Sequence, residues 1–322
     1  MLDYFNADGG DFDGPVLVTG AGGCIGAWAL AILDKAGVPA VAFDLSDDTR
    51  RPALHLAPER LAAIPWLTGD IADTDTVARV VADNGIRAIL HLAALQVPFC
   101  IADPVAGAKV NVVGTVNVFE AARANGIKRV TYASSIAAHG ILHEEYQATL
   151  YGAFKYCDEN IAAVYWQDWG LPSTGIRPGV VYGVGRDRGL TSKTTVAILA
   201  AAARRSYAVP FKGAVSFLHA GEIASAFIKA VSRPREGAPV FDCNGVASTV
   251  EESLDILRDL APGVNLGVSG DELPFPADLS DAPIRDYLGD YGAVPLQAGI
   301  KGTFAAFKDL LAKGQLSPDG IE

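Results

Sequence analysis

The chain has 322 residues, of which 50% are hydrophobic and 20% charged, and its formal net charge is −11. A chain of this length can form one large domain or two closely packed ones. The acidic charge balance argues against nucleic acid and anionic lipid as partners. No apolar run is long enough and free enough of charge to span a bilayer, so no membrane segment is expected.

The N-terminal residues predict a cytoplasmic protein. Residues 1–8 carry acids where a signal peptide needs a basic region and an apolar core. Residues 1–14 contain four aspartates and are expected to form a flexible, solubilising tail. The four cysteines lie far apart and form no CxxC pair, which is typical of free thiols in a reducing compartment.

Short apolar strands alternate with helical stretches through the first half of the chain. Each strand is a nearly continuous apolar run, as expected when helices cover both faces of a sheet. Repeated units of this kind predict an α/β fold with a doubly wound parallel (Rossmann) sheet. The expected strands are 16–19, 41–43, 67–69, 88–91, 129–133 and 173–176, and the expected helices are 25–36, 74–84, 106–125 and 150–169.

The regular alternation stops after Gly179. A loop at 183–189, a helix at 194–203 and a strand followed by a helix over 215–231 are expected next, and the last pair is predicted to rejoin the sheet. Helices and loops follow from residue 249 to about residue 314. The predicted Rossmann domain is residues 15–178 with 213–245, and the predicted capping, substrate-binding lobe is 179–212 with 246–322.

A glycine-rich turn after the first strand predicts a dinucleotide site. Its spacing is GxxGxxG, and such glycines let a pyrophosphate approach the N-terminus of the following helix. Asp44 ends the second strand, where a carboxylate bonds a ribose 2′-hydroxyl and repels a 2′-phosphate, so NAD is expected rather than NADP. Arg50 and Arg51 weaken this preference, although six residues is far for direct contact. The three glycines are Gly20, Gly23 and Gly26.

Tyr151 and Lys155 are four residues apart on a predicted helix and therefore share one face. A nearby cation favours the phenolate form of a tyrosine. The pair can take a proton from an alcohol while a bound cofactor takes the hydride.

With these motifs in place, the sequence resembles the extended short-chain dehydrogenase/reductase group, the NAD-dependent epimerase/dehydratase family, over nearly its whole length. The resemblance implies that Tyr151 is the general base or acid, that Lys155 holds the nicotinamide ribose, and that Ser135 bonds the reacting oxygen. It also implies NAD as cofactor, no metal, and a homodimer formed through a four-helix interface of 106–125 and 150–169. The implied cofactor contacts are Gly20, Gly23, Cys24, Ile25, Gly26, Asp44, Asp70, Ile71, Leu92, Ala93, Ala94, Asn111, Tyr151, Lys155 and Gly179.

Departures from the family pattern narrow the chemistry. Ile136 follows Ser135 where dehydratases carry acids, which disfavours dehydration. Segment 214–219 lacks the arginine that binds diphosphate in nucleotide-sugar epimerases, and the stretch Gly179-Val-Val-Tyr replaces their Asn-Pro pair. The short 135–151 segment suits a small substrate. The substrate contacts expected from position are Gln96, Ser135, Ile136, His139, Arg186 and Arg188.

Arg186 and Arg188 have two interpretations. Either could grip a carboxylate with two parallel hydrogen bonds. In the simpler alternative they belong to a surface loop and pair with Asp187 or with nothing.

The leading functional hypothesis is an NAD-dependent oxidoreductase with a Ser-Tyr-Lys triad, acting on a secondary alcohol of a free sugar, uronate or sugar acid. An NAD-dependent sugar or nucleotide-sugar epimerase with the same triad and tightly bound NAD is the alternative. A non-catalytic NAD(H)-sensing protein is a third hypothesis, and the intact triad speaks against it.

Overall fold

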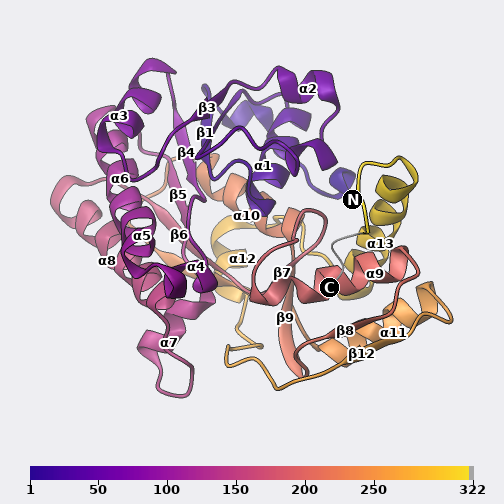
Figure 1. Cartoon of the computed structure of the whole chain (residues 1–322). Helices are drawn as coiled ribbons and strands as arrows, with labels where there is room; N and C mark the ends of the chain where they lie inside the picture. The colour runs from indigo at the N-terminus through magenta and orange to yellow at the C-terminus, as the bar shows by residue number, and fades with distance from the viewer. Residues whose placement is uncertain (319–322) are drawn as a thin grey trace.

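The structure, a computed structural model, describes residues 1–318 and is built around one seven-stranded sheet (Figure 1). The strand order is β10-β6-β5-β4-β1-β2-β3, and every neighbouring pair is parallel. This order confirms the predicted doubly wound parallel sheet. The strands are β1 (Val16–Thr19), β2 (Ala40–Asp44), β3 (Trp66–Thr68), β4 (Ala88–His91), β5 (Val130–Ala133), β6 (Thr174–Pro178) and β10 (Val240–Cys243).

Helices cover both faces of this sheet, giving three layers (Figure 1). Side chains alternate along each strand, so Leu17 of β1 faces one helical layer while its neighbours Val16 and Val18 face the other. Both faces of the sheet are therefore shielded from solvent, which explains the continuous apolar runs in the sequence. One layer holds α3 (Thr74–Asp83), α6 (Gly114–Ala124) and α8 (Leu150–Trp169), and the other holds α1 (Cys24–Lys35) and α10 (Ala220–Val231).

The single helix predicted over 106–125 is interrupted. It runs as α5 (Pro104–Ala108), a π-helical turn η4 (Lys109–Val113) and then α6. The turn brings Asn111 against Leu95, whose backbone N–H and C=O both bond the Asn111 amide at 3.0 Å. A helix α4 (Val97–Ala102), which the sequence did not predict, precedes α5. The π-helical turn thus holds the segment that follows β4 in place through its contact with Leu95.

The sequence predicted that the strand at the start of 215–231 rejoins the large sheet, and this prediction is wrong. β9 (Ala214–His219) pairs with β7 (Val181–Tyr182) and β11 (Val246–Thr249) in a separate three-stranded sheet. α10 then packs on α1, and β10 is the strand that joins the large sheet beside β6. An apolar pattern predicts that a strand is buried, but not which strand it pairs with.

Most of the remaining residues form a small lobe at the lower right of Figure 1. Its predicted helices are present, and an additional strand, β12, pairs in parallel with β8. The division of the chain into a Rossmann domain and a substrate-binding lobe stays a prediction. The elements of the lobe are α9 (Lys193–Ala202), β8 (Tyr207–Val209), α11 (Val250–Leu260), β12 (Leu266–Val268) and α13 (Leu296–Ala312). α12 (Ala282–Leu288) lies outside it and packs on β10 and α10.

The N-terminal segment differs from the flexible tail that its aspartates predicted. Phe5 is fully buried, with its ring centre 5.8 Å from that of Trp28 and 5.6 Å from that of His219. Asp11 pairs with Arg233 at 2.9 Å. Burying one aromatic ring is worth a few kcal/mol, roughly 1.5–3, which favours docking of a segment that its charges alone would leave in solvent.

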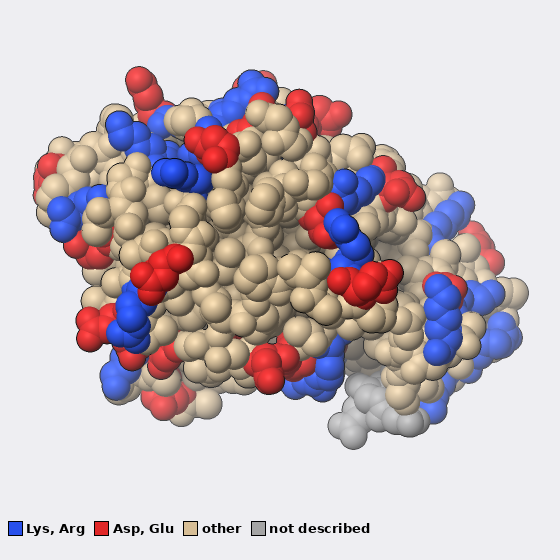
Figure 2. All heavy atoms as spheres, turned by 90° about the horizontal axis from the view of Figure 1, so that it is seen from above, with Lys and Arg blue, Asp and Glu red and all other residues tan. Residues whose placement is uncertain are grey.

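The surface carries charges of both signs. On the face drawn in Figure 2, Lys and Arg side chains alternate with Asp and Glu in small groups. No helix within residues 1–318 is both long enough and apolar enough to cross a membrane.

Candidate active site

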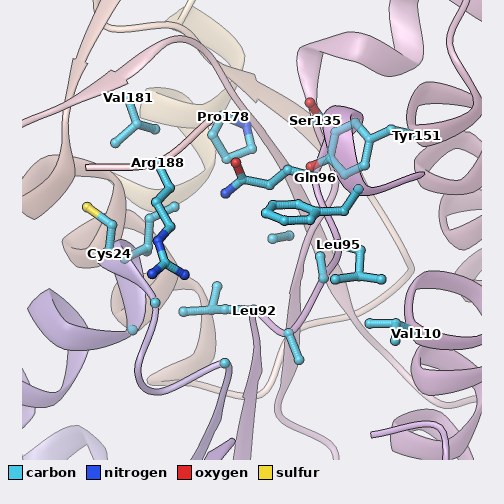
Figure 3. Close-up of a pocket in the computed structure, with 18 of the residues that line it drawn as sticks. Cys24, Leu92, Leu95, Gln96, Val110, Ser135, Tyr151, Pro178, Val181 and Arg188 are labelled. Atoms are coloured by element: carbon cyan, nitrogen blue, oxygen red, sulfur yellow. The ribbon is translucent and has the colours of Figure 1, made fainter. Parts of the chain in front are cut away.

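A pocket of about 530 Å³ opens at the carboxyl ends of the sheet strands. Its floor comes from the turn after β1 and the ends of β2, β4 and β5, and its opposite wall from residues 178–191 (Figure 3). This is where ligands bind in open α/β sheets.

The glycine turn forms the narrow part of the pocket. Gly20 has φ +68°, a conformation that favours glycine, and a Cβ there would lie 2.7 Å from the Ala93 backbone nitrogen. A Cβ on Gly26 would collide with the Gly20 carbonyl oxygen. α1 begins at Cys24, so its free N–H groups face the space that the missing side chains leave. This cradle fits the pyrophosphate of a dinucleotide.

Asp44 is held at the edge of this cradle. Its Oδ2 accepts a hydrogen bond of 2.8 Å from Gly22 N, and its Oδ1 accepts one of 2.7 Å from Leu45 N. Asp70 and Ile71 line the same end of the pocket. The geometry therefore fits the predicted contacts of an adenosine half, with the Asp44 carboxylate available to ribose hydroxyls.

A series of buried, hydrogen-bonded polar side chains holds the backbone segment that follows β4 in place. Thr19 Oγ1 accepts hydrogen bonds from Leu92 N (3.1 Å) and Ala93 N (3.2 Å) and lies 2.8 Å from His91 Nδ1. His91 Nε2 lies 3.2 Å from Thr115 Oγ1. Burial lowers the pKa of His91 to about 3, so the ring is neutral. These contacts hold the expected cofactor-lining backbone in place.

Tyr151 and Ser135 lie together at the other end of the pocket (Figure 3). Ser135 Oγ accepts a hydrogen bond of 3.1 Å from Ala137 N, which leaves its own hydrogen free to donate. Thr149 caps α8 by accepting a hydrogen bond of 3.0 Å from Gly152 N, and this starts the helix that presents Tyr151. The amide of Gln96 points across the pocket toward Pro178 and Arg188 (Figure 3), and its Oε1 lies close to Gly189.

Lys155 lies behind Tyr151 and does not line the pocket. Its Nζ is 6.0 Å from the centre of the Tyr151 ring and 3.2 Å from Asp158 Oδ2. The lysine is only 1% exposed. It is therefore placed to act on the phenol electrostatically from inside the protein.

The wall opposite the glycine turn carries two arginines. Arg186 Nη2 donates to Thr191 Oγ1 at 3.1 Å, while its Nε is enclosed and has no hydrogen-bond partner within residues 1–318. Burial lowers the pKa of Arg186, against the raising effect of Cys24 and Tyr151. Arg188 also lines the pocket and points toward the Cys24 end (Figure 3).

In the simpler alternative, Arg186 or Arg188 would pair with Asp187, but the structure shows a different partner for this aspartate. Asp187 pairs instead with Arg51 at 2.6 Å, and Arg51 Nη1 donates to the Gly22 carbonyl at 2.9 Å. Arg51 thus lines the pocket, although its separation from Asp44 in the sequence is large for direct contact. Arg50 pairs with Asp48 at 2.6 Å.

Two further expected contacts do not reach the pocket. His139 Nε2 lies 2.8 Å from Asp242 Oδ1, and the residue is buried away from the cavity, so its predicted substrate role lacks geometric support. Asn111 does not line the pocket, and its amide instead makes hydrogen bonds with the Leu95 backbone. Phe275 lines the pocket and was missed, since it comes from an irregular loop with no local signal. The predicted residues that do line the pocket are Gly20, Gly23, Cys24, Ile25, Gly26, Asp44, Asp70, Ile71, Leu92, Ala93, Ala94, Gln96, Ser135, Ile136, Tyr151, Gly179, Arg186 and Arg188.

A doubly wound sheet with a glycine cradle and an acid at the second strand defines the class of dinucleotide-binding α/β proteins. Within this class, the sequence model of the NAD dependent epimerase/dehydratase family matches residues 16–244, and the chain belongs to that family. NAD, the predicted cofactor, is the cofactor of this family.

Individual relatives agree with this assignment. The chain is 28% identical over 287 residues to a UDP-glucose 4-epimerase of Azospirillum brasilense, which covers 80% of this chain and 78% of that protein. It is 28% identical over 315 residues to a UDP-glucose 4-epimerase of Mycolicibacterium smegmatis, covering 91% and 98%.

Solved structures confirm the fold. A UDP-glucose 4-epimerase of Thermus thermophilus in complex with NAD superposes with a TM-score of 0.75 at 24% identity, covering 91% of this chain and 99% of that one. An L-threonine dehydrogenase of Clostridium difficile gives a TM-score of 0.79 at 17% identity, covering 92% and 98%. Epimerases and dehydrogenases both share the architecture, so the fold does not separate these two activities.

Proposed function

We propose that the protein is an NAD-dependent dehydrogenase that oxidises a secondary alcohol of a small carbohydrate-like acid, such as a uronate or sugar acid. The observation that carries the proposal is the Arg186 guanidinium at the pocket, with an enclosed Nε that lacks a partner within residues 1–318. A half-buried guanidinium at a pocket favours an anionic ligand. A neutral sugar could accept hydrogen bonds from it but would leave its positive charge without a counter-ion.

The stretch after β6 supports a small substrate over a nucleotide sugar, because Gly179-Val-Val-Tyr stands where the epimerases carry an Asn-Pro pair. A Cβ on Gly179 would lie 2.5 Å from Ser216 Oγ and 2.9 Å from the Asn244 carbonyl oxygen. No side chain larger than hydrogen therefore fits at position 179 as the backbone stands. β9 also lacks their diphosphate-binding arginine.

The residues of the pocket fit this chemistry as follows. The glycine turn and Asp44 hold the dinucleotide, and the chemistry that bound NAD supplies is hydride acceptance. Tyr151 takes the proton of the substrate hydroxyl, and the cation of Lys155 stabilises the phenolate. Ser135 donates a hydrogen bond to the reacting oxygen, while Arg186 orients the substrate through its carboxylate.

The test is NADH absorbance with NAD and a panel of free sugars, uronates, sugar acids and nucleotide sugars. We expect stoichiometric NADH from a small acid, and a loss of about 10³-fold in kcat for Tyr151→Phe, since general-base catalysis contributes roughly 10²–10⁴-fold. Tyr156→Phe is the matched control, because Tyr156 lies on the same helix and does not line the pocket. Full activity of Tyr151→Phe would contradict the proposal.

The second candidate is an NAD-dependent sugar epimerase. Its support is the 28% identity to UDP-glucose 4-epimerases along most of both chains. Such an enzyme returns the hydride and shows no net NADH. Purified protein that carries NAD, together with a sugar that changes configuration without NADH release, would favour this candidate over the dehydrogenase.

We also propose a homodimer through the expected helix pair. Apolar side chains on these helices are exposed in the single chain, among them Val113 (42%), Leu150 (45%) and Val164 (46%). Pairing with a second copy would bury them. Light scattering should give twice the chain mass of 33.6 kDa, and a monomer mass would contradict the proposal.

A further inference from the structure

The helix that presents Tyr151 also carries a buried ion pair. Lys155 Nζ lies 3.2 Å from Asp158 Oδ2, and the two residues are 1% and 0% exposed. Residues three apart on a helix share a face, so the carboxylate approaches the lysine from within the protein. Burying a carboxylate is costly unless a cation compensates it, and Lys155 supplies that cation.

The surroundings of Asp158 leave it dependent on Lys155. Its Oδ1 has no hydrogen-bond partner in the described part of the chain, and the neighbouring Thr115 hydroxyl donates to the Asn111 carbonyl at 2.7 Å. Burial raises the pKa of Asp158 to about 6, against the lowering effect of Lys155 and a smaller one of the Thr115 hydroxyl. The titratable groups that face this pair are Cys157 and Glu159 of α8, Cys100 of α4, His91 of β4 and Tyr132 of β5.

We propose that Asp158 is a positioning residue that sets how strongly Lys155 acts on Tyr151. The carboxylate attracts the ammonium group and offsets the positive potential that the ammonium exerts at the phenol. An ionised Asp158 therefore makes the phenolate less favourable, and a neutral one leaves the whole lysine charge to Tyr151. The lysine has three N–H donors, so one bond to Asp158 leaves two for the phenol and for a ribose.

This inference rests on the proposed role of Tyr151, but its test needs no substrate. Tyrosine labelled with ¹³C at Cζ reports phenol ionisation by NMR, and the Tyr151 resonance is the one missing from Tyr151→Phe. The spectra are recorded against pH with NAD absent and present. The measurement remains informative if no member of the sugar panel is oxidised, so the two proposals fail separately.

Asp158→Asn is the decisive variant. We expect the ionisation midpoint of Tyr151 to move to lower pH by about one unit, roughly 1.4 kcal/mol, because the lysine charge is then no longer offset at the phenol. Glu159→Gln is the matched control. Glu159 is a buried neighbour on the same helix, but it pairs with Arg177 at 2.6 Å rather than with Lys155, so its removal should move the midpoint much less.

The wild-type protein provides a second measurement if Asp158→Asn does not fold, which circular dichroism would show. The Tyr151 resonance should then show a small inflection near pH 6, where Asp158 takes up its proton. An unchanged or higher Tyr151 midpoint in folded Asp158→Asn would overturn the proposal. Absence of the inflection in the wild type would also overturn it.

Discussion

The two walls of the pocket are built from different groups. The wall formed by the glycine turn and by residues 92–94 presents mostly backbone, held by Thr19 and Asp44. The wall formed by residues 183–191 presents the side chains of Arg186 and Arg188. Backbone recognition suits a ligand part that never changes, such as a pyrophosphate, whereas side chains can be exchanged to fit a substrate.

If the wall formed by the glycine turn binds NAD through its backbone, it should not tolerate an added methyl group. Gly26→Ala puts a methyl group against the Gly20 carbonyl oxygen and should weaken NAD binding about 100-fold, the upper end of the cost of overpacking. Gly267→Ala is the matched control, since a Cβ there meets nothing within 4 Å. Titration calorimetry with NAD checks both variants, and near-normal affinity of Gly26→Ala would refute the backbone cradle.

The side-chain wall should govern the substrate and not the cofactor. Arg186→Met should lower kcat/KM for a carboxylate substrate about 30-fold or more, the loss expected when one partner of a buried charge pair is removed. Activity toward the corresponding neutral sugar should change little. Arg79→Met, an exposed arginine of α3, serves as the control. Equal losses for acid and neutral substrate would remove the carboxylate from the proposal.

The smallest expected effect concerns the contact between the two walls. Asp187→Asn releases Arg51, which lies beside Gly22 and Asp44, and should raise affinity for NADPH relative to NADH by up to about fivefold, since exposed ion pairs are worth at most about 1 kcal/mol. Asp34→Asn releases Arg60 far from the pocket and is the control. Fluorescence titration with both reduced cofactors measures the ratio. An unchanged ratio would mean that Arg51 does not reach the 2′ position.

Six strands of the sheet were predictable because each is a local apolar run bounded by a helix, whereas β10 at the edge was not among the expected strands. The pairing of β9 was not, because burial of a strand does not specify its neighbour. The break at η4 was also hidden, since it depends on the contact of Asn111 with Leu95 and on the tight packing of Gly114 against Ile71.

The cofactor side of the site was predictable for a similar reason. The glycines, Asp44 and the Tyr151–Lys155 pair lie in short motifs whose geometry follows from one strand or one helix. Arg51 and Phe275 come from loops that only the folded chain brings to the pocket. His139 was placed in the site because it follows Ser135 closely, but its ring turns to Asp242 instead.

Phe5 links the sheet region and the lobe. Its ring clusters with those of Trp28 and His219 and packs so closely on α10 that Gly221 has no space for a Cβ. On the lobe side, a Cβ on Gly292 would lie 3.3 Å from Phe5 Cδ1. An aromatic side chain shared by both regions couples their stabilities, because neither can come apart without exposing it. Heating should therefore melt the sheet and the lobe in a single cooperative calorimetric transition.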